Sequence, residues 1–394
     1  MNQEFFATAL QKIATGPMEV AELISAATAL TESGQPSLSR QLYRAWLERN
    51  GGHPQRFVVQ FNCSVLSSQA SDLVSAREEL AAAISGHLDF IPGYINLGGV
   101  LEKMGAPDAA MEQWNAALAR LTPVTGNAVQ YKLATLKQIA RLCSEKQDFE
   151  AAEAAMGESL DIHPKQRDVI EQYVAVRLSQ CKWPVAAPRE LLSRAEIVAG
   201  MHPLSVEAYT DDPLLQLAAA HRYVEESIRE APGGAADRRN APIDTKGRRL
   251  RIGYVSSDLR DHAVGYLMSE VFELHDRAKV EVFAYYCGIH DPNGLQRRLK
   301  ASVEHWREIR DLSDEAAAQM IADDGIDILV DVNGHTRDSR TAIFARRPAP
   351  VQVNWLGYPG TMGTPYHHYI IGDDWITPEG SEAWFSETIL RLPC

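Results

Sequence analysis

The stretch from Leu250 to His262 reads LRIGYVSSDLRDH, and it decides the fold of the second half of the chain. Its opening residues are mostly apolar, which is typical of a buried strand, and small polar residues end the run. Apolar residues then recur at helical spacing from Ala263 to Leu274. A strand followed at once by such a helix is the first unit of a doubly wound α/β domain.

The same alternation of strand and helix continues toward the end of the chain. Further strands are predicted at Val280–Cys287, Ile326–Val332, Val351–Trp355 and Tyr369–Ile371, and helices at Leu295–Val303 and Asp314–Asp324. In open sheets of this kind, ligands bind outside the carboxyl ends of the strands. Candidate site residues are therefore expected in the loops Ser256–His262, Asn333–Arg337 and Leu356–Thr361.

The first half of the chain has a different pattern. It is rich in Ala, Leu and Glu with apolar residues at helical spacing, and the composition changes near Pro232. The stretch Pro232–Asn240 is polar, contains Gly and Pro, and predicts a linker or exposed loop. We expect a helical repeat region at residues 1–200, a connecting segment at 201–247 and an α/β lobe at 248–394.

One segment of the helical half has the spacing of a tetratricopeptide repeat. From Tyr94 it runs through Leu97, Gly98, Leu101, Gly105, Ala110, Trp114 and Ala117, and a weaker copy follows from Ile139 to Pro164. The small residues allow neighbouring helices to approach closely. Stacked pairs of this kind form a solenoid whose concave side binds a peptide or protein. An ordinary array of Ala- and Leu-rich helices is the alternative.

The bulk composition excludes several classes of protein. The 394 residues carry a formal net charge of −13, whereas nucleic-acid-binding domains usually carry clustered Lys and Arg. Five cysteines, far apart and without a CxxC, favour neither a disulfide framework nor a zinc site. No signal peptide and no membrane span is recognised. We expect a cytoplasmic protein that binds neither nucleic acid nor membrane.

The loop after the first strand contains the first candidates for chemistry. Asp258, Asp261 and His262 lie within five residues, and a carboxylate beside an imidazole can orient a proton acceptor. The alternative is structural: Asp258 caps the following helix and His262 is a polar residue of its first turn. Spacing alone favours this structural alternative.

The other strand ends offer weaker signals. Asn333–Arg337 has the sequence of a turn that ends a strand. Asp373 and Asp374 also follow a strand and could hold a divalent cation, but no third carboxylate lies at a matching strand end, so no metal is predicted. Neither a GxGxxG nor a P-loop is present, which disfavours standard dinucleotide and nucleoside triphosphate sites.

The segment Val351–Trp355 leads into Trp355–Thr361, WLGYPGT, in which Gly357, Pro359 and Gly360 predict a rigid loop that exposes its backbone N–H groups. Together with GYVSSD at Gly253–Asp258 and RPAPVQ at Arg347–Gln352, this loop resembles the catalytic region of protein O-linked N-acetylglucosamine transferases. The bacterial SPINDLY-like branch is the most similar, and tetratricopeptide repeats precede the catalytic region in that family.

The resemblance implies one Rossmann-like lobe of a GT-B glycosyltransferase after the repeats. It also implies an inverting, metal-independent transfer of N-acetylglucosamine, or a related sugar, from a UDP-type donor to Ser or Thr of an acceptor protein, with no cofactor besides that donor. Asp258 and His262 would lie by the reacting sugar. Leu356, Gly357, Tyr358, Pro359 and Gly360 would contact the sugar and phosphate through the backbone, and the repeats would bind the acceptor.

Two departures from the family pattern are visible. No histidine aligns in the segment Tyr209–Leu214, and His202 and His221 are out of register. The family's second lobe, which carries most nucleotide-binding residues, would begin beyond Cys394. Two alternatives therefore remain: a non-catalytic repeat scaffold with half of a transferase site, and a related transferase that modifies Asn.

Overall fold

The computed structural model describes residues 2–16, 18–121, 126–228, 234, 236–291 and 294–393. The chain divides into two compact units, Met1–Trp183 with Pro188–Ser193 and Pro184–Ala187 with Arg194–Cys394, and each is described by itself. The expected linker at Pro232–Asn240 lies partly outside the described residues. The expected domain limits at residues 200 and 247 stay a prediction.

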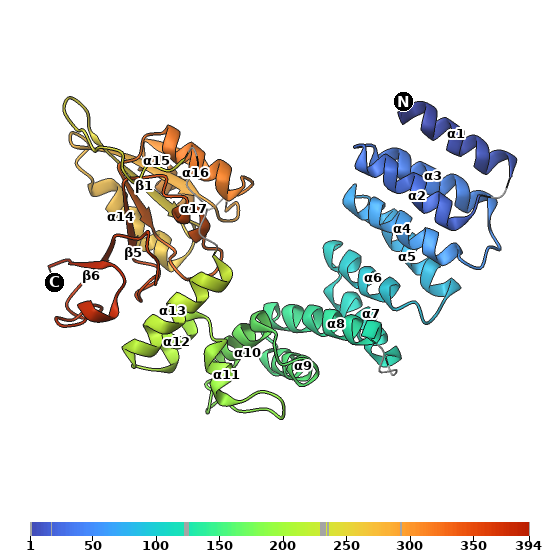
Figure 1. Ribbon diagram of the computed structural model, residues 1–394, viewed down its shortest axis with the longest axis horizontal. Helices are drawn as coiled ribbons and strands as arrows, with labels where there is room; N and C mark the ends of the chain where they lie inside the picture. Colours follow the sequence, from blue (N-terminus) through green and yellow to red (C-terminus); the bar gives the residue numbers. More distant parts are fainter. Residues whose placement is uncertain are drawn as a thin grey trace. The chain divides into compact units, whose positions relative to one another are not determined.

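The first unit is an array of helices stacked along the chain (Figure 1). Its helices are α1 (Asn2–Thr15), α2 (Val20–Glu32), α3 (Pro36–Arg49), α4 (Arg56–Gln69), α5 (Leu73–Gly86), α6 (Ile91–Lys103), α7 (Pro107–Arg120), α8 (Gly126–Glu145), α9 (Phe149–Ile162) and α10 (Arg167–Ser179). Consecutive helices contact each other as pairs, and the predicted repeat from Tyr94 to Ala117 spans α6 and α7. The expected repeat architecture is confirmed.

The contact between α6 and α7 depends on a glycine. Trp114 of α7 is fully buried, and its indole N–H donates to the Ile95 carbonyl at 3.1 Å. A Cβ atom on Gly98 of α6 would lie 2.2 Å from that indole nitrogen, well inside van der Waals contact. The aromatic ring therefore packs directly on the backbone of the neighbouring helix.

We expect Gly98→Ala to lower the free energy of unfolding of the first unit by about 1–3 kcal/mol, the usual cost of overpacking. Gly99→Ala is the matched control, because its Cβ would meet no described atom within 4 Å. In the middle of a helix that change is expected to stabilise by up to about 1 kcal/mol. Thermal and urea denaturation measure both variants, and equal effects would contradict the packing described.

The second unit begins with three helices, of which the first two are short, and continues as an α/β domain. The helices are α11 (Arg194–Ala199), α12 (Pro203–Tyr209), α13 (Pro213–Ser227), α14 (Ala263–Leu274), α15 (Gly294–Ala301), α16 (Asp314–Asp323) and α17 (Thr341–Ala345), with a 3₁₀ turn at Glu382–Trp384. The strands are β1 (Leu250–Ser256), β2 (Val280–Tyr286), β3 (His305–Glu308), β4 (Ile328–Asp331), β5 (Val351–Trp355), β6 (Tyr369–Gly372) and β7 (Thr388–Arg391).

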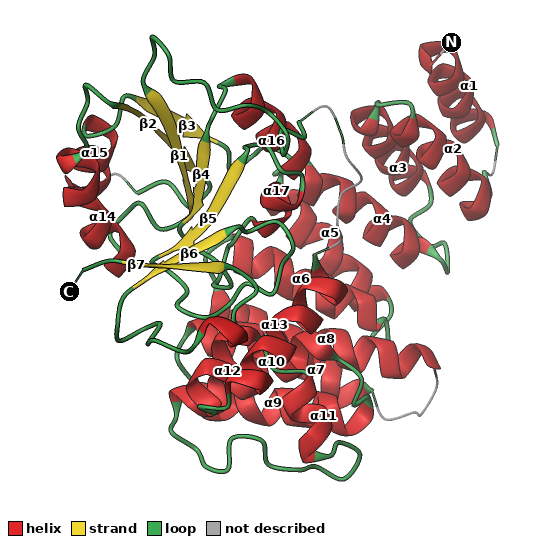
Figure 2. Ribbon diagram, turned by 60° about the vertical axis from the view of Figure 1, so that its left-hand side comes forward, coloured by secondary structure: helices red, strands yellow, loops and turns green. Residues whose placement is uncertain are grey.

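All seven strands form one sheet in the order β3-β2-β1-β4-β5-β6-β7, and every neighbouring pair is parallel. Helices α14 and α15 cover one face, and α16 and α17 cover the other (Figure 2). Successive residues of a strand point to opposite faces. Accordingly, Tyr254 packs with Phe272 of α14, whereas Val255 packs in the core that contains Ile321 of α16. The expected Rossmann-like lobe is confirmed.

Three elements were not predicted. They are the edge strands β3 and β7 and the five-residue helix α17. The first of these, His305–Glu308, is a short edge strand with a largely polar sequence. It therefore lacks the apolar run that identified the inner strands. The predicted elements otherwise agree with the structure within two or three residues.

Candidate functional site

The sheet has one topological switch point, between β1 and β4. From β1 the chain proceeds outward to β2 and β3, and from β4 it proceeds outward the other way to β5, β6 and β7. The loops that follow β1 and β4 therefore diverge at the carboxyl edge, where doubly wound sheets bind ligands. Two of the three predicted loops, Ser256–His262 and Asn333–Arg337, lie at this point.

Asn333 joins these two loops through its side-chain amide. Its Oδ1 accepts the Ser257 backbone N–H at 2.8 Å. Its Nδ2 donates to the Ser257 hydroxyl at 2.8 Å and to Oδ2 of Asp258 at 3.0 Å. The Asn333 side chain is buried, so these bonds are shielded from water. A residue that the sequence placed in an ordinary turn therefore fixes the position of Asp258.

Asp258 is buried at the switch point but is not isolated. Its backbone N–H donates to the Ser256 hydroxyl at 3.0 Å, and its Oδ1 lies 3.6 Å from a guanidinium nitrogen of Arg260. It does not cap α14, which excludes the structural alternative for this residue. The carboxylate is held in position by one hydrogen bond from an amide and has one neighbouring cation.

His262 caps α14. Its Nδ1 accepts the Val264 backbone N–H at 3.3 Å, so in the neutral ring the proton lies on Nε2. The side chain is exposed. Among the described residues no hydrogen bond joins His262 to Asp258. Spacing had suggested a carboxylate beside an imidazole, but in the structure the two groups have separate hydrogen-bond partners. The capping role that the structural alternative gave to Asp258 belongs to His262.

The other acidic candidates have structural contacts. Asp261 hydrogen-bonds the Tyr266 hydroxyl, which raises the pKa of that phenol. Asp373 accepts the backbone N–H groups of Trp375 and Ile376 at 2.8 and 2.7 Å and so closes a turn after β6. Across the described ranges, no group of three or more His, Cys, Asp or Glu is arranged to hold a metal ion.

The third predicted loop follows β5. Leu356 has φ +86°, a left-handed conformation that costs a branched residue of this size about 1–3 kcal/mol. A Cβ atom on Gly357 would lie 2.1 Å from the Val332 carbonyl oxygen, so only glycine fits against the loop after β4. In the part of the chain that the structure describes, no hydrogen bond uses the backbone N–H of Gly357, Tyr358 or Gly360. Within the described structure, these three N–H groups therefore lack an intramolecular hydrogen-bond acceptor.

Tyr358 anchors this loop. Its ring is buried and its hydroxyl donates to Oε1 of Glu207 in α12 at 3.3 Å. Burial raises the pKa of Tyr358 well above its usual value. A Cβ atom on Gly360 would lie 2.2 Å from the same Glu207 oxygen. Of the five predicted donor-binding residues, Tyr358 and Gly360 are thus buried, while Leu356, Gly357 and Pro359 are partly or largely exposed.

His335 lies between this loop and α13. Its Nε2 is 2.8 Å from the Met362 carbonyl, and its ring makes edge contacts with Tyr358 and Tyr223 at 5.2 and 5.0 Å between centroids. The Tyr223 ring in turn contacts His202, which caps α12 through the Leu204 N–H. Burial lowers the pKa of His335 to about 4. The neutral ring is therefore part of the packing that supports the loop.

The buried imidazole of His335 makes the free energy of unfolding depend on pH. Since the pKa of His335 is about 4 when folded and about 6.5 when unfolded, the unfolded chain binds the extra proton. The contribution of the neutral His335 ring to the free energy of unfolding is complete above pH 6.5. As the pH falls toward 4 this contribution is lost, which amounts to about 3 kcal/mol in total.

We expect His335→Phe to flatten the decrease of unfolding free energy between pH 7 and pH 4, as measured by urea denaturation at each pH. The exposed His290 provides the matched control, and His290→Asn is expected to leave the slope unchanged. Parallel slopes for the wild type and His335→Phe would show that His335 is not responsible.

Sequence reasoning gave no role to Asn333 and His335, although both lie in the predicted loop Asn333–Arg337, and it missed Glu207 of α12. A signal for Asn333 was present, since two adjacent parallel strands both end in polar residues at the same edge. No sequence signal links Glu207 to Tyr358, which are separated by 151 positions. The structure does not test the predicted roles of Asp258, His262 and Leu356–Gly360, which stay predictions.

Over the described residues, no helix is long and apolar enough to cross a membrane. Cys63, Cys143 and Cys287 are buried free thiols, and burial raises the pKa of each of them. Thiol chemistry is therefore not favoured at these positions. The expected cytoplasmic location stays a prediction.

Comparison with known sequences confirms the predicted resemblance. Residues 236–393 match the model of the family described as glycosyl transferase family 41. The probable UDP-N-acetylglucosamine–peptide N-acetylglucosaminyltransferase SEC of Arabidopsis thaliana is 36% identical over 203 residues, which are 50% of this chain and 21% of that protein. The corresponding transferase of Caenorhabditis elegans is 43% identical over 148 residues, 37% of this chain and 13% of that protein.

Among solved structures, an O-GlcNAc transferase from Thermobaculum terrenum has the same fold. Its TM-score is 0.51 at 24% identity, over 85% of this chain and 57% of that one. The chain spans about a fifth or less of the length of the curated relatives that it matches. The likeness in structure concerns the fold alone.

Proposed function

We propose that this chain, whose residues 236–393 match glycosyl transferase family 41, takes part in transferring N-acetylglucosamine from UDP-N-acetylglucosamine to Ser or Thr of proteins. The observation that carries the proposal is the arrangement at the switch point. Asp258, held by Asn333, lies at the same edge as a loop with unpaired backbone N–H groups. An acceptor for a proton and donors for an anion are the two groups that an inverting transfer requires.

Asp258 is the proposed proton acceptor. In the transfer, the acceptor hydroxyl oxygen bonds to the anomeric carbon of the sugar while the bond from that carbon to the phosphate oxygen breaks, and the diphosphate leaves with the electron pair. The hydroxyl proton passes to a carboxylate oxygen of Asp258. Asn333 donates to Oδ2 of Asp258 at 3.0 Å, whereas the Arg260 guanidinium lies 3.6 Å from Oδ1, beyond hydrogen-bond distance, so Oδ1 is the oxygen proposed to receive the proton.

His262 is the proposed positioning residue for the sugar. Because Nδ1 accepts the helix N–H, Nε2–H is a donor that points away from that contact and is suited to a sugar oxygen. The loop Leu356–Gly360 is the proposed wall of the donor site. Its unpaired N–H groups suit the developing negative charge of the departing diphosphate.

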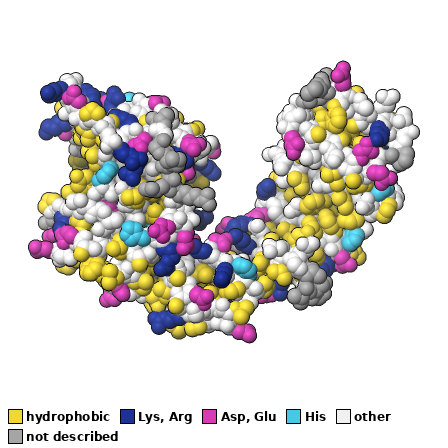
Figure 3. All heavy atoms as spheres, viewed as in Figure 1, with side chains coloured by type: hydrophobic (Ala, Val, Ile, Leu, Met, Phe, Trp, Pro, Cys, Tyr) yellow, Lys and Arg dark blue, Asp and Glu magenta, His cyan; other side chains and the backbone are white. Residues whose placement is uncertain are grey.

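The repeats are the proposed acceptor-binding region. A groove of about 390 Å³ in the first unit is lined by residues of α4 to α8, among them the amides of Gln69, Asn96 and Gln138. Amide side chains can both donate to and accept from a peptide backbone, which suits sequence-tolerant binding of a polypeptide. Figure 3 shows hydrophobic side chains exposed on the viewed face of this unit, which also suits a protein ligand.

The proposal is tested by incubating the chain with UDP-N-acetylglucosamine and an acceptor protein and recording intact mass. Asp258→Asn is expected to reduce transfer about 1,000-fold, and His262→Ala about 100-fold. Asp261→Asn is the matched control and is expected to be active, since that carboxylate contacts Tyr266. Full activity of Asp258→Asn would overturn the assignment of the proton acceptor.

Binding is measured separately by calorimetry with UDP-N-acetylglucosamine and with UDP. Binding without transfer would favour the non-catalytic scaffold. If transfer occurs, mass spectrometry of the modified peptide identifies the side chain that carries the sugar, and modification of Asn would replace Ser or Thr in the proposal.

A further inference from the structure

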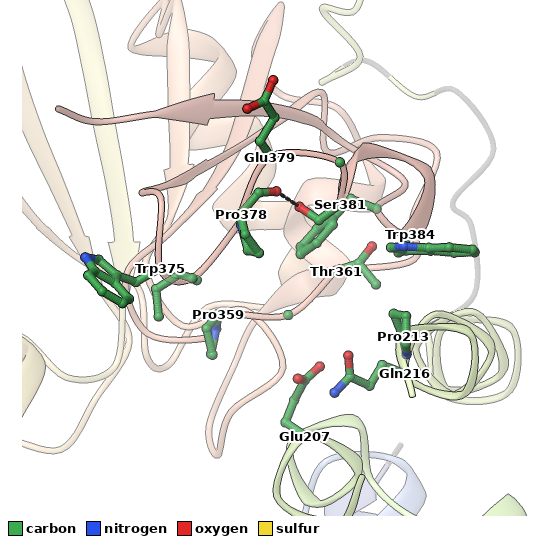
Figure 4. Close-up of a pocket in the computed structure, with 14 residues that line it drawn as sticks. Glu207, Pro213, Gln216, Pro359, Thr361, Trp375, Pro378, Glu379, Ser381 and Trp384 are labelled. Atoms are coloured by element: carbon green, nitrogen blue, oxygen red, sulfur yellow. Dashed lines mark hydrogen bonds between the residues drawn. The ribbon is translucent and has the colours of Figure 1, made fainter. Parts of the chain in front are cut away.

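A pocket of about 550 Å³ lies beside the loop Leu356–Gly360 in the second unit (Figure 4). It is lined by α12, α13 and the segment after β6. It includes Pro359 and Gly360 of the loop but no residue of the loops that follow β1 and β4. It is therefore distinct from the switch-point site while sharing one of its walls.

The polar side chains at the base of this pocket present acceptors. Glu207 uses Oε1 for the Tyr358 hydroxyl, and no described residue hydrogen-bonds its Oε2. The Nε2 of Gln216 donates to the Thr210 carbonyl at 2.9 Å, which leaves its Oε1 as an acceptor. In Figure 4 the carboxylate of Glu207 and the amide of Gln216 lie next to each other. A ligand that only donates hydrogen bonds fits this pair.

The ionisable side chains that line the pocket are acidic. Among the described residues that line it, Glu207 and the exposed Glu379 are the ionisable ones, and none is Lys or Arg. Burial raises the pKa of Glu207 despite the hydrogen bond from Tyr358, which is the mark of a carboxylate without enough compensating charge. Arg391 of β7 hydrogen-bonds to Glu382 and to the Thr377 and Pro378 carbonyls, so its guanidinium is already engaged.

Aromatic rings form the rim. Trp384 and Trp375 line the pocket on different sides of Pro378 in Figure 4. Trp375 is 85% exposed, which is unusual for the largest apolar side chain. Its backbone is tied into the turn after β6, because Asp373 accepts its N–H at 2.8 Å. An exposed indole beside an acidic pocket can bind a cation over its ring face.

We propose that this pocket binds a lysine or arginine side chain of a polypeptide. The cationic group would donate to Glu207 and Gln216, and its methylene stem would lie along Trp384 and Pro378. The inference deepens the proposed function, on which it rests for the identity of the polypeptide as an acceptor protein. It would give the transferase a preference for a basic residue near the modified site.

The test measures binding without any sugar donor, so that its outcome is independent of transfer. The probe is a fluorescein-labelled five-residue peptide with one central lysine flanked by glycine and serine, titrated with the full chain and followed by anisotropy. The same peptide with arginine is expected to bind comparably. The norleucine peptide, which has the same stem without the charge, is expected to bind about tenfold more weakly.

Variants locate the site. Glu207→Gln and Trp384→Ala are each expected to weaken the binding of the lysine peptide about tenfold, and Trp384→Ala leaves both partners of the Tyr358–Glu207 hydrogen bond in place. Glu225→Gln on α13 and Trp183→Ala in the first unit are matched controls, since both residues are exposed and outside the pocket. Absence of lysine binding, equal binding of the norleucine peptide, or binding unaffected by Glu207→Gln and Trp384→Ala would each overturn the proposal.

Discussion

A Gly357→Ala variant is expected to lose about 3 kcal/mol of unfolding free energy and at least about 100-fold in transfer. The added Cβ would lie 2.1 Å from the Val332 carbonyl oxygen and 3.2 Å from that of Asn333. Both atoms are backbone, and the Val332 N–H is bonded to the Val255 carbonyl at 3.0 Å. The loop after β4 therefore cannot move aside without breaking its attachment to β1, so the loop after β5 must be displaced.

Thermal denaturation measures the first effect and the mass-based transfer assay the second. Gly294→Ala is the matched control, because its Cβ would meet no described atom within 4 Å. The stability measurement does not depend on whether the chain transfers sugar. An unchanged melting temperature for Gly357→Ala would mean that the loop after β5 is not pressed against the loop after β4.

Asn333→Asp is expected to produce the second large effect. The new carboxylate would replace the amide that donates to Oδ2 of Asp258 at 3.0 Å, and two ionised carboxylates buried at that distance repel each other. We expect a loss of about 3 kcal/mol at pH 7.5 and a smaller loss at pH 5, where one of the pair takes up a proton. Transfer is expected to fall about 1,000-fold, because Asp258 loses the hydrogen bond that holds it in position.

Two comparisons isolate the cause. Asn333→Ala removes the amide without adding a charge, so its loss of stability is expected to be similar at both pH values. Asn240→Asp makes the same chemical change at an exposed position and is expected to be neutral. Urea denaturation at the two pH values supplies the measurement. A loss for Asn333→Asp that does not depend on pH would contradict the repulsion between the two carboxylates.

The core of the second unit was predictable because its strands are buried on both faces. Strands β1, β4 and β5 consist largely of apolar residues, so their limits could be read from hydrophobicity. The edge strand β7 could not, since Thr388 and Leu390 are exposed and no apolar run identifies it. The switch point depends on the order of the strands in the sheet. The sequence does not state that order directly, so the switch point could not be located from it.

The candidate site was predictable only in part. Asp258 and the loop Leu356–Gly360 follow predicted strands, and their positions at one edge follow from a parallel sheet. The hydrogen-bond partners that hold these residues in place could not be predicted, because they come from distant positions in the sequence. Asn333 lies 75 residues from Asp258, and Glu207 lies 151 residues from Tyr358. Such contacts depend on how whole elements pack, which local patterns do not encode.

The glycines at the carboxyl edge bear on how the loops move. A Cβ on Gly288, after β2, would lie 2.0 Å from the Ser257 carbonyl, and Gly357 has the equivalent relation to Val332. Loops after four strands thus touch backbone to backbone in two pairs, and the Ser257–Asn333 bond joins the pairs. Segments coupled in this way open together, so their amide hydrogens should exchange with deuterium at one common rate. A ligand would then meet a surface that is already ordered before it arrives.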